Sequence, residues 1–202
     1  NVYAAHCARQ MGVPIKTLLV ATNKNDILTR FYETGEMKMD GVDATLSPSM
    51  DIQISSNFER YLFDILDRNA DDLVSLMNQF KTTGHFIVPD DVLQKALSGF
   101  RAYRADDQET LDTIRRINDE YGYTLDPHTA VGMKGALEWI QDNDTPIVAL
   151  ACAHPAKFPD AVTKAGLDHP ALPSHLADLF DREERVTTLP NDMKTIQDFI
   201  RG

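Results

Sequence analysis

An uninterrupted apolar run near the carboxyl end of the chain constrains its fold most strongly. All residues in 147–153 are apolar, with Thr145-Pro146 before them and His154-Pro155 after them. A continuous run of this length is typical of a strand buried on both faces in a parallel sheet. Pro155 stands where a helix can begin, and apolar residues then recur at helical spacing. The sequence therefore predicts a strand, a tight turn and a helix.

Three side chains that can carry chemistry lie at the end of this predicted strand. In open α/β sheets the ligand crevice lies outside the carboxyl ends of the strands, where Cys152, His154 and Lys157 fall. Lys157 would stand in the first helical turn, where a cation opposes the helix dipole, and a nearby anion would remove that conflict. The alternative is that Lys157 is a surface residue and that His154 hydrogen-bonds its own turn.

The same pattern occurs near the amino terminus. A predicted helix over 2–11 precedes a buried-type strand over 15–21, and a second helix follows over 27–35. Helices and strands joined by short loops are typical of an α/β fold, in which helices cover a parallel sheet. Asn23 and Asn25 follow the strand, so they are candidates to line a site, although one of them can equally be a helix N-cap.

The rest of the chain divides by its pattern into three parts. Residues 36–56 have loop chemistry and no helical period, whereas 57–125 show helical spacing with one short strand over 100–105. Residues 126–202 return to mixed elements. Asp126-Pro127-His128 predicts a helix start, with His128 as a polar residue of its first turn. We therefore predict that 1–56 and 126–202 belong to one large α/β domain and that 57–125 is a mostly helical insertion.

The later elements of 126–202 can also be predicted. They are a helix over 127–140, the strand over 147–153, a helix from 156, a short helix over 173–180, a strand over 186–189 and a closing helix over 193–200.

Composition excludes several classes of partner. The formal net charge of -11 and the pI of about 4.9 argue against nucleic acid or an anionic membrane as the main partner. No apolar segment approaches the roughly 18 residues of a membrane span. Cys7 and Cys152 are far apart and show no metal-like spacing, so we expect no metal site and a reducing cytoplasm. The chain has no initiator Met, and we expect that it starts inside a domain.

Five sequence motifs resemble motifs of one protein family, and they occur in the same order as in that family along the whole chain. They are the residues 20–28, 46–52, 55–60, 125–132 and 153–158. All are similar to threonine synthase, in the branch with a large helical insertion that is found in fungi and many bacteria. The resemblance implies a pyridoxal-phosphate enzyme of fold type II, with a mostly parallel three-layer sheet domain. Such an enzyme converts O-phospho-L-homoserine and water into L-threonine and phosphate.

The resemblance also implies roles for particular residues. The family holds the cofactor phosphate with a Gly-Asn-Phe-Gly loop at a helix N-terminus, and Asn1 matches the residue directly after that loop. Cys152 stands where the family usually has a Thr whose hydroxyl meets the pyridine nitrogen, and its thiol is a weaker donor. The lysine that forms the Schiff base belongs to an upstream part of the family's sequence. This chain then contains no catalytic residue, and it is expected to be inactive without the amino-terminal part of the enzyme.

Two other functions stay open on the sequence. One is a different fold type II enzyme such as a dehydratase, against which the insertion and the string 46–52 argue. The other is a paralogue that has kept the fold, lost the lysine and become a binding domain. A product assay with phosphohomoserine, threonine and serine distinguishes a dehydratase from a threonine synthase. The presence or absence of the lysine and the Gly-rich loop upstream of Asn1 distinguishes the paralogue from the enzyme.

Overall fold

A computed structural model describes residues 2–140 and 145–202 of the chain. It divides into two compact units, Asn1–Pro170 and Ala171–Gly202.

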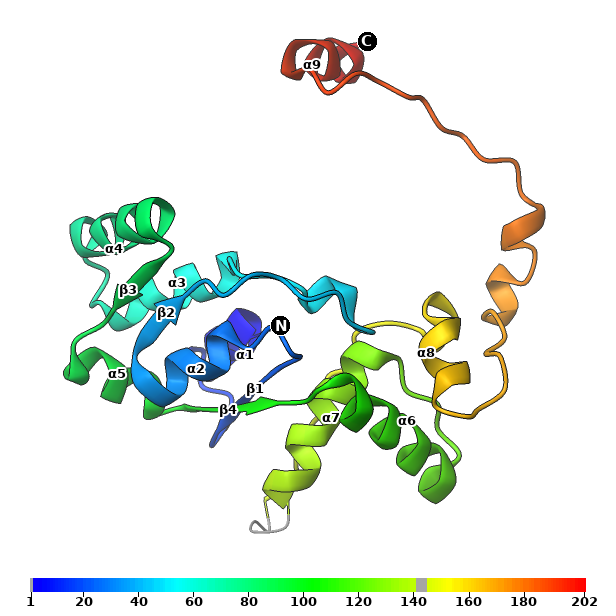
Figure 1. Ribbon diagram of the computed structural model, residues 1–202, viewed down its shortest axis with the longest axis horizontal. Helices are drawn as coiled ribbons and strands as arrows, with labels where there is room; N and C mark the ends of the chain where they lie inside the picture. Colours follow the sequence, from blue (N-terminus) through cyan, green and yellow to red (C-terminus); the bar gives the residue numbers. More distant parts are fainter. Residues whose placement is uncertain (1, 141–144) are drawn as a thin grey trace. The chain divides into compact units, whose positions relative to one another are not determined.

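The first unit alternates helices with short strands (Figure 1). Its described strands are β1 Leu18–Thr22, β2 Glu36–Lys38, β3 His85–Ile87 and β4 Phe100–Arg104. Its described α-helices are α1 Val2–Gln10, α2 Ile27–Thr34, α3 Ser56–Ile65, α4 Ala70–Thr83, α5 Asp90–Leu97, α6 Asp107–Tyr121, α7 Pro127–Ile140 and α8 Pro159–Lys164. Two short 3₁₀ turns, η1 Pro48–Met50 and η2 Pro155–Lys157, complete it. The prediction of an α/β fold is confirmed.

A parallel strand pair lies at the centre of this unit. β1 pairs with β4 in parallel, from Leu18 opposite Phe100 to Thr22 opposite Arg104, and both α2 and α7 pack on the pair. The prediction of a parallel sheet is therefore confirmed, although the pairing of β1 with β4 was not predicted. β2 and β3 form a separate antiparallel pair. Because β4 lies within 57–125, the predicted insertion contributes a strand to the central pair, and the predicted domain boundaries stay a prediction.

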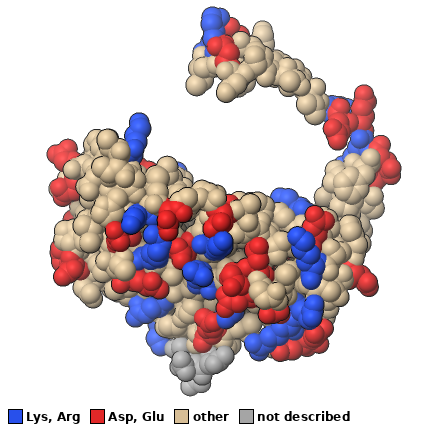
Figure 2. All heavy atoms as spheres, in the orientation of Figure 1, with Lys and Arg blue, Asp and Glu red and all other residues tan. Residues whose placement is uncertain are grey.

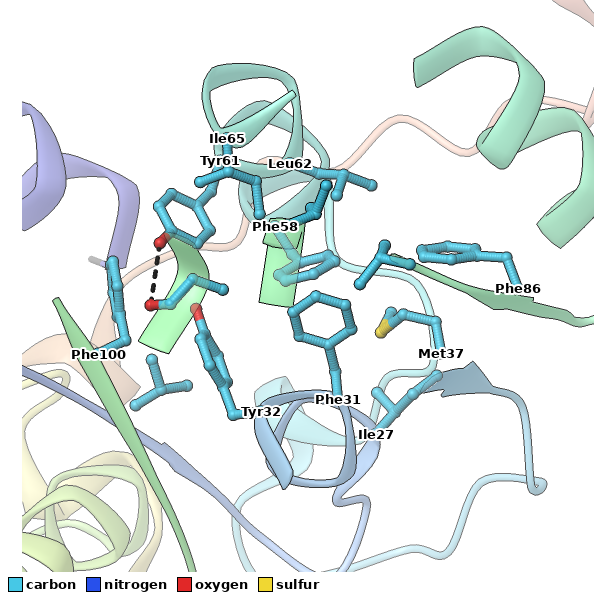
Figure 3. Close-up of a cluster of buried hydrophobic side chains, with 14 of the residues drawn as sticks. Ile27, Phe31, Tyr32, Met37, Phe58, Tyr61, Leu62, Ile65, Phe86 and Phe100 are labelled. Carbon is cyan, nitrogen blue, oxygen red and sulfur yellow. Dashed lines mark hydrogen bonds between the residues drawn. The ribbon is translucent and has the colours of Figure 1, made fainter. Parts of the chain in front are cut away.

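An aromatic core holds the helices against these strands (Figure 3). Phe31 of α2 meets Phe58 of α3 edge to face, with 4.6 Å between the ring centroids. Phe100 of β4 is fully buried and packs against Tyr61 of α3. The Tyr61 hydroxyl donates a hydrogen bond of 3.2 Å to the carbonyl of Ala96 in α5, so its buried polar group is satisfied.

A smaller core joins α6, α7 and α8. Ile114 of α6, Ala130 of α7 and Ala165 at the end of α8 are completely buried in it. The start of α6 is fixed by a capping box in which Asp106 accepts from the N–H of Glu109 while the Glu109 carboxylate accepts from the N–H of Asp106. This core and cap set the position of α7, whose first turn carries the candidate site.

The prediction of a buried strand over 147–153 is wrong for the described chain. Residues 147–153 form no strand and pair with none of the described strands, and the side chains of Val148 and Leu150 are 82% and 52% exposed. The backbone N–H groups of Cys152 and Ala153 instead donate to side chains of the first turn of α7. A strand needs ladder partners, and these two donors are already used.

The second unit contains the short turns η3 Ser174–Leu176 and η4 Leu179–Asp181, followed by α9 Met193–Arg201. The closing helix is therefore confirmed, with Asp192 as its N-cap. The predicted helix over 173–180 is instead two 3₁₀ turns. The predicted strand over 186–189 is wrong, since 186–188 are exposed and the range forms no ladder with any described strand.

The predicted loop over 36–56 and the expectation of no membrane span can also be compared with the structure. The range 36–56, predicted as a loop, begins with β2, and β3 was not predicted at all. None of the described helices is long and apolar enough to cross a membrane. Figure 2 shows Lys and Arg side chains interspersed with Asp and Glu on the visible face, so no broad basic surface appears there.

Candidate active site

The first turn of α7 is built around one buried carboxylate. Asp126 is 1% exposed and directly precedes the helix. Its Oδ1 accepts from the backbone N–H of His128 at 2.9 Å and of Thr129 at 3.4 Å, which is the pattern of a helix N-cap. Its Oδ2 accepts from the hydroxyl of Thr129. Buried carboxylates are stabilised when several donors surround them, so Asp126 is rigidly placed.

This carboxylate also fixes the segment that carries Cys152. The N–H of Ala153 donates to Asp126 Oδ2 at 3.3 Å, and the N–H of Cys152 donates to Thr129 Oγ1 at 2.9 Å. Asp126 and Thr129 are both buried, so these bonds are shielded from water. The main chain at 152–153 is thus held against the start of α7 by two side chains.

His128 links α7 to two other segments. Its Nδ1 lies 3.0 Å from Asp126 Oδ1, and its Nε2 accepts from the N–H of Ser49 at 3.3 Å. Because Nε2 acts as an acceptor, the geometry fits the tautomer with the hydrogen on Nδ1. The ring also packs on Phe158, with 4.6 Å between centroids. His128, predicted as a polar residue of the first turn, therefore connects η1, α7 and the residue after η2.

Asn23 and Asn25 hold a loop at the carboxyl end of β1. Both are buried, and the Nδ2 atoms of both donate to Oδ1 of Asp51, at 2.7 and 2.9 Å. Oδ1 of Asn23 accepts from the N–H of Asn25, and Oδ1 of Asn25 accepts from the N–H of Asp43. Asp51 further accepts from the N–H and the hydroxyl of Thr45. This network folds residues 43–51 onto the strand end, next to the Ser49 that meets His128.

Neither asparagine is the side-chain cap of α2. The N-cap position is Asp26, which makes no side-chain cap hydrogen bond and instead pairs with Arg30 and Arg104. The hydrogen bonds of Asn23 and Asn25 are directed at the loop, and their contact with a substrate stays a prediction.

The remaining candidates lie on the segment after residue 151. Cys152 is exposed, and its Sγ lies 3.5 Å from the carbonyl oxygen of Leu150. His154 is exposed and caps η2 through Nδ1, which accepts from the N–H of Ala156 at 3.2 Å. Lys157 is exposed and its Nζ lies 5.8 Å from the centre of the Phe158 ring. The sequence allowed His154 to hydrogen-bond its own turn, and its capping bond confirms that local role. A contact of His154 or Lys157 with a substrate stays a prediction.

Asn1, predicted at the cofactor phosphate, lies outside the described residues. In the part of the chain that the structure describes, no three His, Cys, Asp or Glu side chains come together as a set of metal ligands. Sequence reasoning gave Asp126 only a capping role, and it assigned nothing to Thr129 or Asp51. The string Asp126-Pro-His-Thr was the available signal for the first two, because Asp and Thr at the start of a helix can both bond outside it.

Comparisons with known proteins show what the whole chain is similar to. The family model "Threonine synthase, C-terminal" matches residues 129–200. The threonine synthase of Pseudomonas aeruginosa is 46% identical over 201 residues, which are 99% of this chain and 43% of that protein. The crystal structure of threonine synthase from Brucella melitensis, with bound pyridoxal phosphate, has a TM-score of 0.90 at 46% identity and covers 99% of this chain and 43% of its own. Yeast threonine synthase gives a TM-score of 0.86 at 34% identity, over 98% and 44%.

Such agreement in fold over nearly the whole chain defines its class, an α/β protein of the fold type II group. Within that class the chain matches the carboxyl-terminal portion of threonine synthases along nearly its whole length. The resemblance carried by the five sequence strings is thereby confirmed. The chain spans less than half the length of the relatives that it matches.

Proposed function

We propose that the protein containing this chain is a threonine synthase that uses pyridoxal phosphate to convert O-phospho-L-homoserine and water into L-threonine and phosphate. The observation that carries the proposal is the fixed position of Cys152, which two buried side chains hold at the start of α7. The identity of 46% to the threonine synthase of Pseudomonas aeruginosa over 99% of the chain supports the same activity.

The residues present fit the cofactor at one point. The family places a neutral donor at the pyridine nitrogen, and Cys152 offers an exposed thiol on a main chain that Thr129 and Asp126 hold in place. When bound, pyridoxal phosphate supplies the electron sink for the reaction, while the protein supplies orientation and electrostatics. Thr129 then positions the main chain at Cys152, and Asp126 keeps the Thr129 hydroxyl directed so that it can accept from the backbone N–H of Cys152.

The loop 43–51 gives the site a second wall. Asn23, Asn25 and Asp51 hold this loop at the carboxyl end of β1, and Ser49 joins it to His128. In α/β sheets, ligands bind outside the carboxyl ends of strands. We propose that the substrate lies on this side, where His154 and Lys157 can reach it, and that the amino-terminal part of the enzyme supplies the opposite wall.

The proposal includes the parts of the enzyme that lie beyond this chain. We propose that the lysine that binds the cofactor and the phosphate loop before Asn1 belong to that amino-terminal part, so that residues 1–202 alone are inactive. We also propose that the enzyme is cytoplasmic. Cys7 and Cys152 are far apart in the sequence, which fits a reducing compartment.

The direct test is to express the complete reading frame that contains this chain and to supply phosphohomoserine, L-threonine or L-serine in separate assays. Formation of threonine and phosphate from phosphohomoserine alone is the expected result. Formation of 2-oxo acids from threonine or serine would instead identify a dehydratase. A complete protein that folds but binds no pyridoxal phosphate would support the non-catalytic paralogue.

The isolated chain has a separate test. Borohydride reduction with pyridoxal phosphate, followed by peptide mapping, is expected to give no specific adduct on Lys157 and no threonine. A specific Lys157 adduct accompanied by turnover would show that the chain carries its own catalytic lysine, against the proposal.

A further inference from the structure

A basic hollow lies between α1, α3 and α5, and none of its residues belongs to the candidate active site. Its volume is about 340 Å³. The side chains used below are those of His6, Arg9, Asp64, Arg68 and Lys95. Arg68 pairs with Asp64 and Lys95 pairs with Asp67, whereas Arg9 pairs with no carboxylate among the described residues. One positive charge therefore stays unbalanced there, although the chain as a whole carries a formal charge of -11. A local excess of positive charge on an acidic chain points to an anion.

Arg9 is the cation with the most unused donors. Its Nη1 donates to the carbonyl of Gly99 at 3.2 Å, and its guanidinium lies 5.7 Å from the centre of the Phe100 ring. Gly99 is required for this approach, because an added Cβ would lie 2.0 Å from Nη1. No carboxylate pairs with Arg9 among the residues described by the structure. A planar guanidinium held in this way presents its other N–H groups for bidentate contact with an oxyanion.

His6 is a buried polar side chain that lacks a proper partner. It is 4% exposed, and neither of its ring nitrogens makes a hydrogen bond within the described part of the chain. Nε2 lies 3.4 Å from Asp64 Oδ2, close enough for an ion pair but without hydrogen-bond geometry. Buried polar groups are normally satisfied, and an unsatisfied group that lines a hollow is an expected ligand contact.

The charges around His6 come from three elements. Tyr3 and Arg9 lie on its own helix, Asp64 and Tyr61 on α3, and Phe100 on β4 packs against its ring. Burial lowers the pKa of His6, with Asp64 acting in the opposite direction. Burial also raises the pKa of Tyr61 to about 12, so its hydroxyl stays a donor to Ala96. An anion in the hollow would favour protonated His6.

Two cations at the rim are held by an unusual turn. Asp67 and Arg68 both have positive φ angles, of 56° and 60°, which non-glycine residues seldom adopt. In this turn Arg68 Nε donates to Asp64 at 3.1 Å, and Lys95 Nζ donates to Asp67 at 2.7 Å. The turn therefore keeps both cations beside the hollow.

We propose that this hollow binds a small anion of the phosphate class, either free phosphate or a phosphomonoester. Arg9 and His6 would contact it from the floor, and Arg68 and Lys95 from the rim. The site is independent of the proposed enzyme activity, because it shares no residue with the candidate active site.

Another hollow, beside α6 and α7, provides a control. It contains Lys134, which pairs with Glu109 at 3.4 Å and with Glu138, and it is also lined by Asp112. Lys134 is thus a cation whose charge is already balanced by two carboxylates. Lys134→Gln should leave anion binding unchanged.

The test is calorimetric titration of the 202-residue chain with inorganic phosphate at constant ionic strength, and with sulfate and O-phospho-L-serine in parallel. One saturable site is expected. Arg9→Gln should weaken binding about tenfold or more, since bonds between charged partners are the strong ones. The double variant Arg68→Gln/Lys95→Gln should weaken binding by a similar factor, and it leaves Arg9 and His6 at the floor of the hollow unchanged. Tighter binding of phosphoserine than of phosphate would assign the site to a phosphomonoester, and the reverse order to free phosphate.

Sulfate, which does not titrate near neutral pH, reports the proton linkage. In buffers with different ionisation enthalpies, its binding should be coupled to proton uptake, and His6→Gln should abolish that coupling. Absence of saturable binding, or equal affinity in wild type and in Arg68→Gln/Lys95→Gln, would overturn the proposal. So would binding that disappears in the complete protein, because the hollow would then be filled by the rest of the enzyme. Loss of threonine synthesis with intact anion binding would contradict only the proposed function.

Discussion

Replacing Asp126 by Asn is expected to destabilise the first unit although it changes the shape of the side chain very little. Five donors converge on this carboxylate. Oδ1 faces the backbone N–H groups of His128 and Thr129 and Nδ1 of His128, while Oδ2 faces the hydroxyl of Thr129 and the N–H of Ala153. An amide must place an NH₂ group at one of these two positions, and donors surround both.

Each orientation of the amide leaves a conflict. With NH₂ at the Oδ1 position, it opposes the N–H groups of His128 and Thr129. With NH₂ at the Oδ2 position, it opposes the N–H of Ala153, and the Thr129 hydroxyl loses its acceptor. One buried N–H without an acceptor costs about 1–3 kcal/mol, and the remaining bonds lose the strength that a charged acceptor gives them. The lower cost of burying a neutral amide offsets part of this loss.

We therefore expect Asp126→Asn to lower the free energy of unfolding by about 2–4 kcal/mol. For a unit of this size, that corresponds to a fall in melting temperature of roughly 5–15 °C. Urea unfolding and scanning calorimetry measure both quantities. Hydrogen exchange at the N–H of Ala153 should also become faster, because this group loses its acceptor.

Asp106→Asn is the matched control. Asp106 also stands before a helix, but its Oδ1 accepts from the N–H of Glu109 alone among the described bonds of this side chain. Asn caps helices about as well as Asp, so this change should cost only a few tenths of a kcal/mol. Equal stability losses in the two variants would refute the argument from converging donors.

Three further predictions follow from the same contacts. Thr129→Val should accelerate hydrogen exchange at the N–H of Cys152 and destabilise the unit by about 1–3 kcal/mol, whereas Thr129→Ser should keep both bonds and stay close to wild type; equal effects would contradict the role of the hydroxyl. In the complete enzyme, Cys152→Thr should preserve or raise turnover of phosphohomoserine and Cys152→Asp should lower it, whereas a tolerated Asp and an unaffected Ala would mean that Cys152 only packs. Because burial lowers the pKa of His6, its neutral form stabilises the fold above its unfolded pKa of about 6.5, and this stabilisation should be lost as the pH falls through the lowered pKa; urea midpoints between about pH 5 and pH 8 should show a shallower slope for His6→Gln, and an unchanged slope would exclude His6 as the source.

Local sequence signals predicted the helices well and the ladders less well. Helical spacing at Phe58, Tyr61 and Leu62 gave α3, because these side chains form one buried stripe within a single element. β1 and β4 could each be recognised as strands, but their pairing joins residues about 80 positions apart. The strand β3 has three residues and follows Gly84 directly, so it offers too short a pattern for period two to be seen.

The contacts that support the candidate site could not be predicted from the sequence. Cys152 is a candidate because it lies near the end of an apolar run, which is a local signal. Thr129 and Asp126 fix it from more than 20 positions away, and nothing in their own surroundings indicates a bond to residue 152 or 153. Asn23 and Asn25 were placed correctly at a strand end. Their bonds to Asp51 depend on how the loop 43–51 folds back, which residue spacing does not determine.

The segment 147–151 has the sequence pattern of a strand but forms none, and its side-chain exposure suggests the reason. Val148 and Leu150 are exposed while Ile147 and Ala149 are half-buried, which is the alternation of a strand that lacks a neighbour. Covering Val148 and Leu150 would contribute about 1.5–3 kcal/mol each, and a neighbouring strand would also satisfy the main-chain groups. If this chain is the carboxyl-terminal portion of a threonine synthase, the amino-terminal part is expected to supply that strand. Hydrogen exchange at residues 147–151 should then be fast in the isolated chain and strongly protected in the complete protein. Equally fast exchange in both would mean that the run stays unpaired and that its apolar character serves another contact.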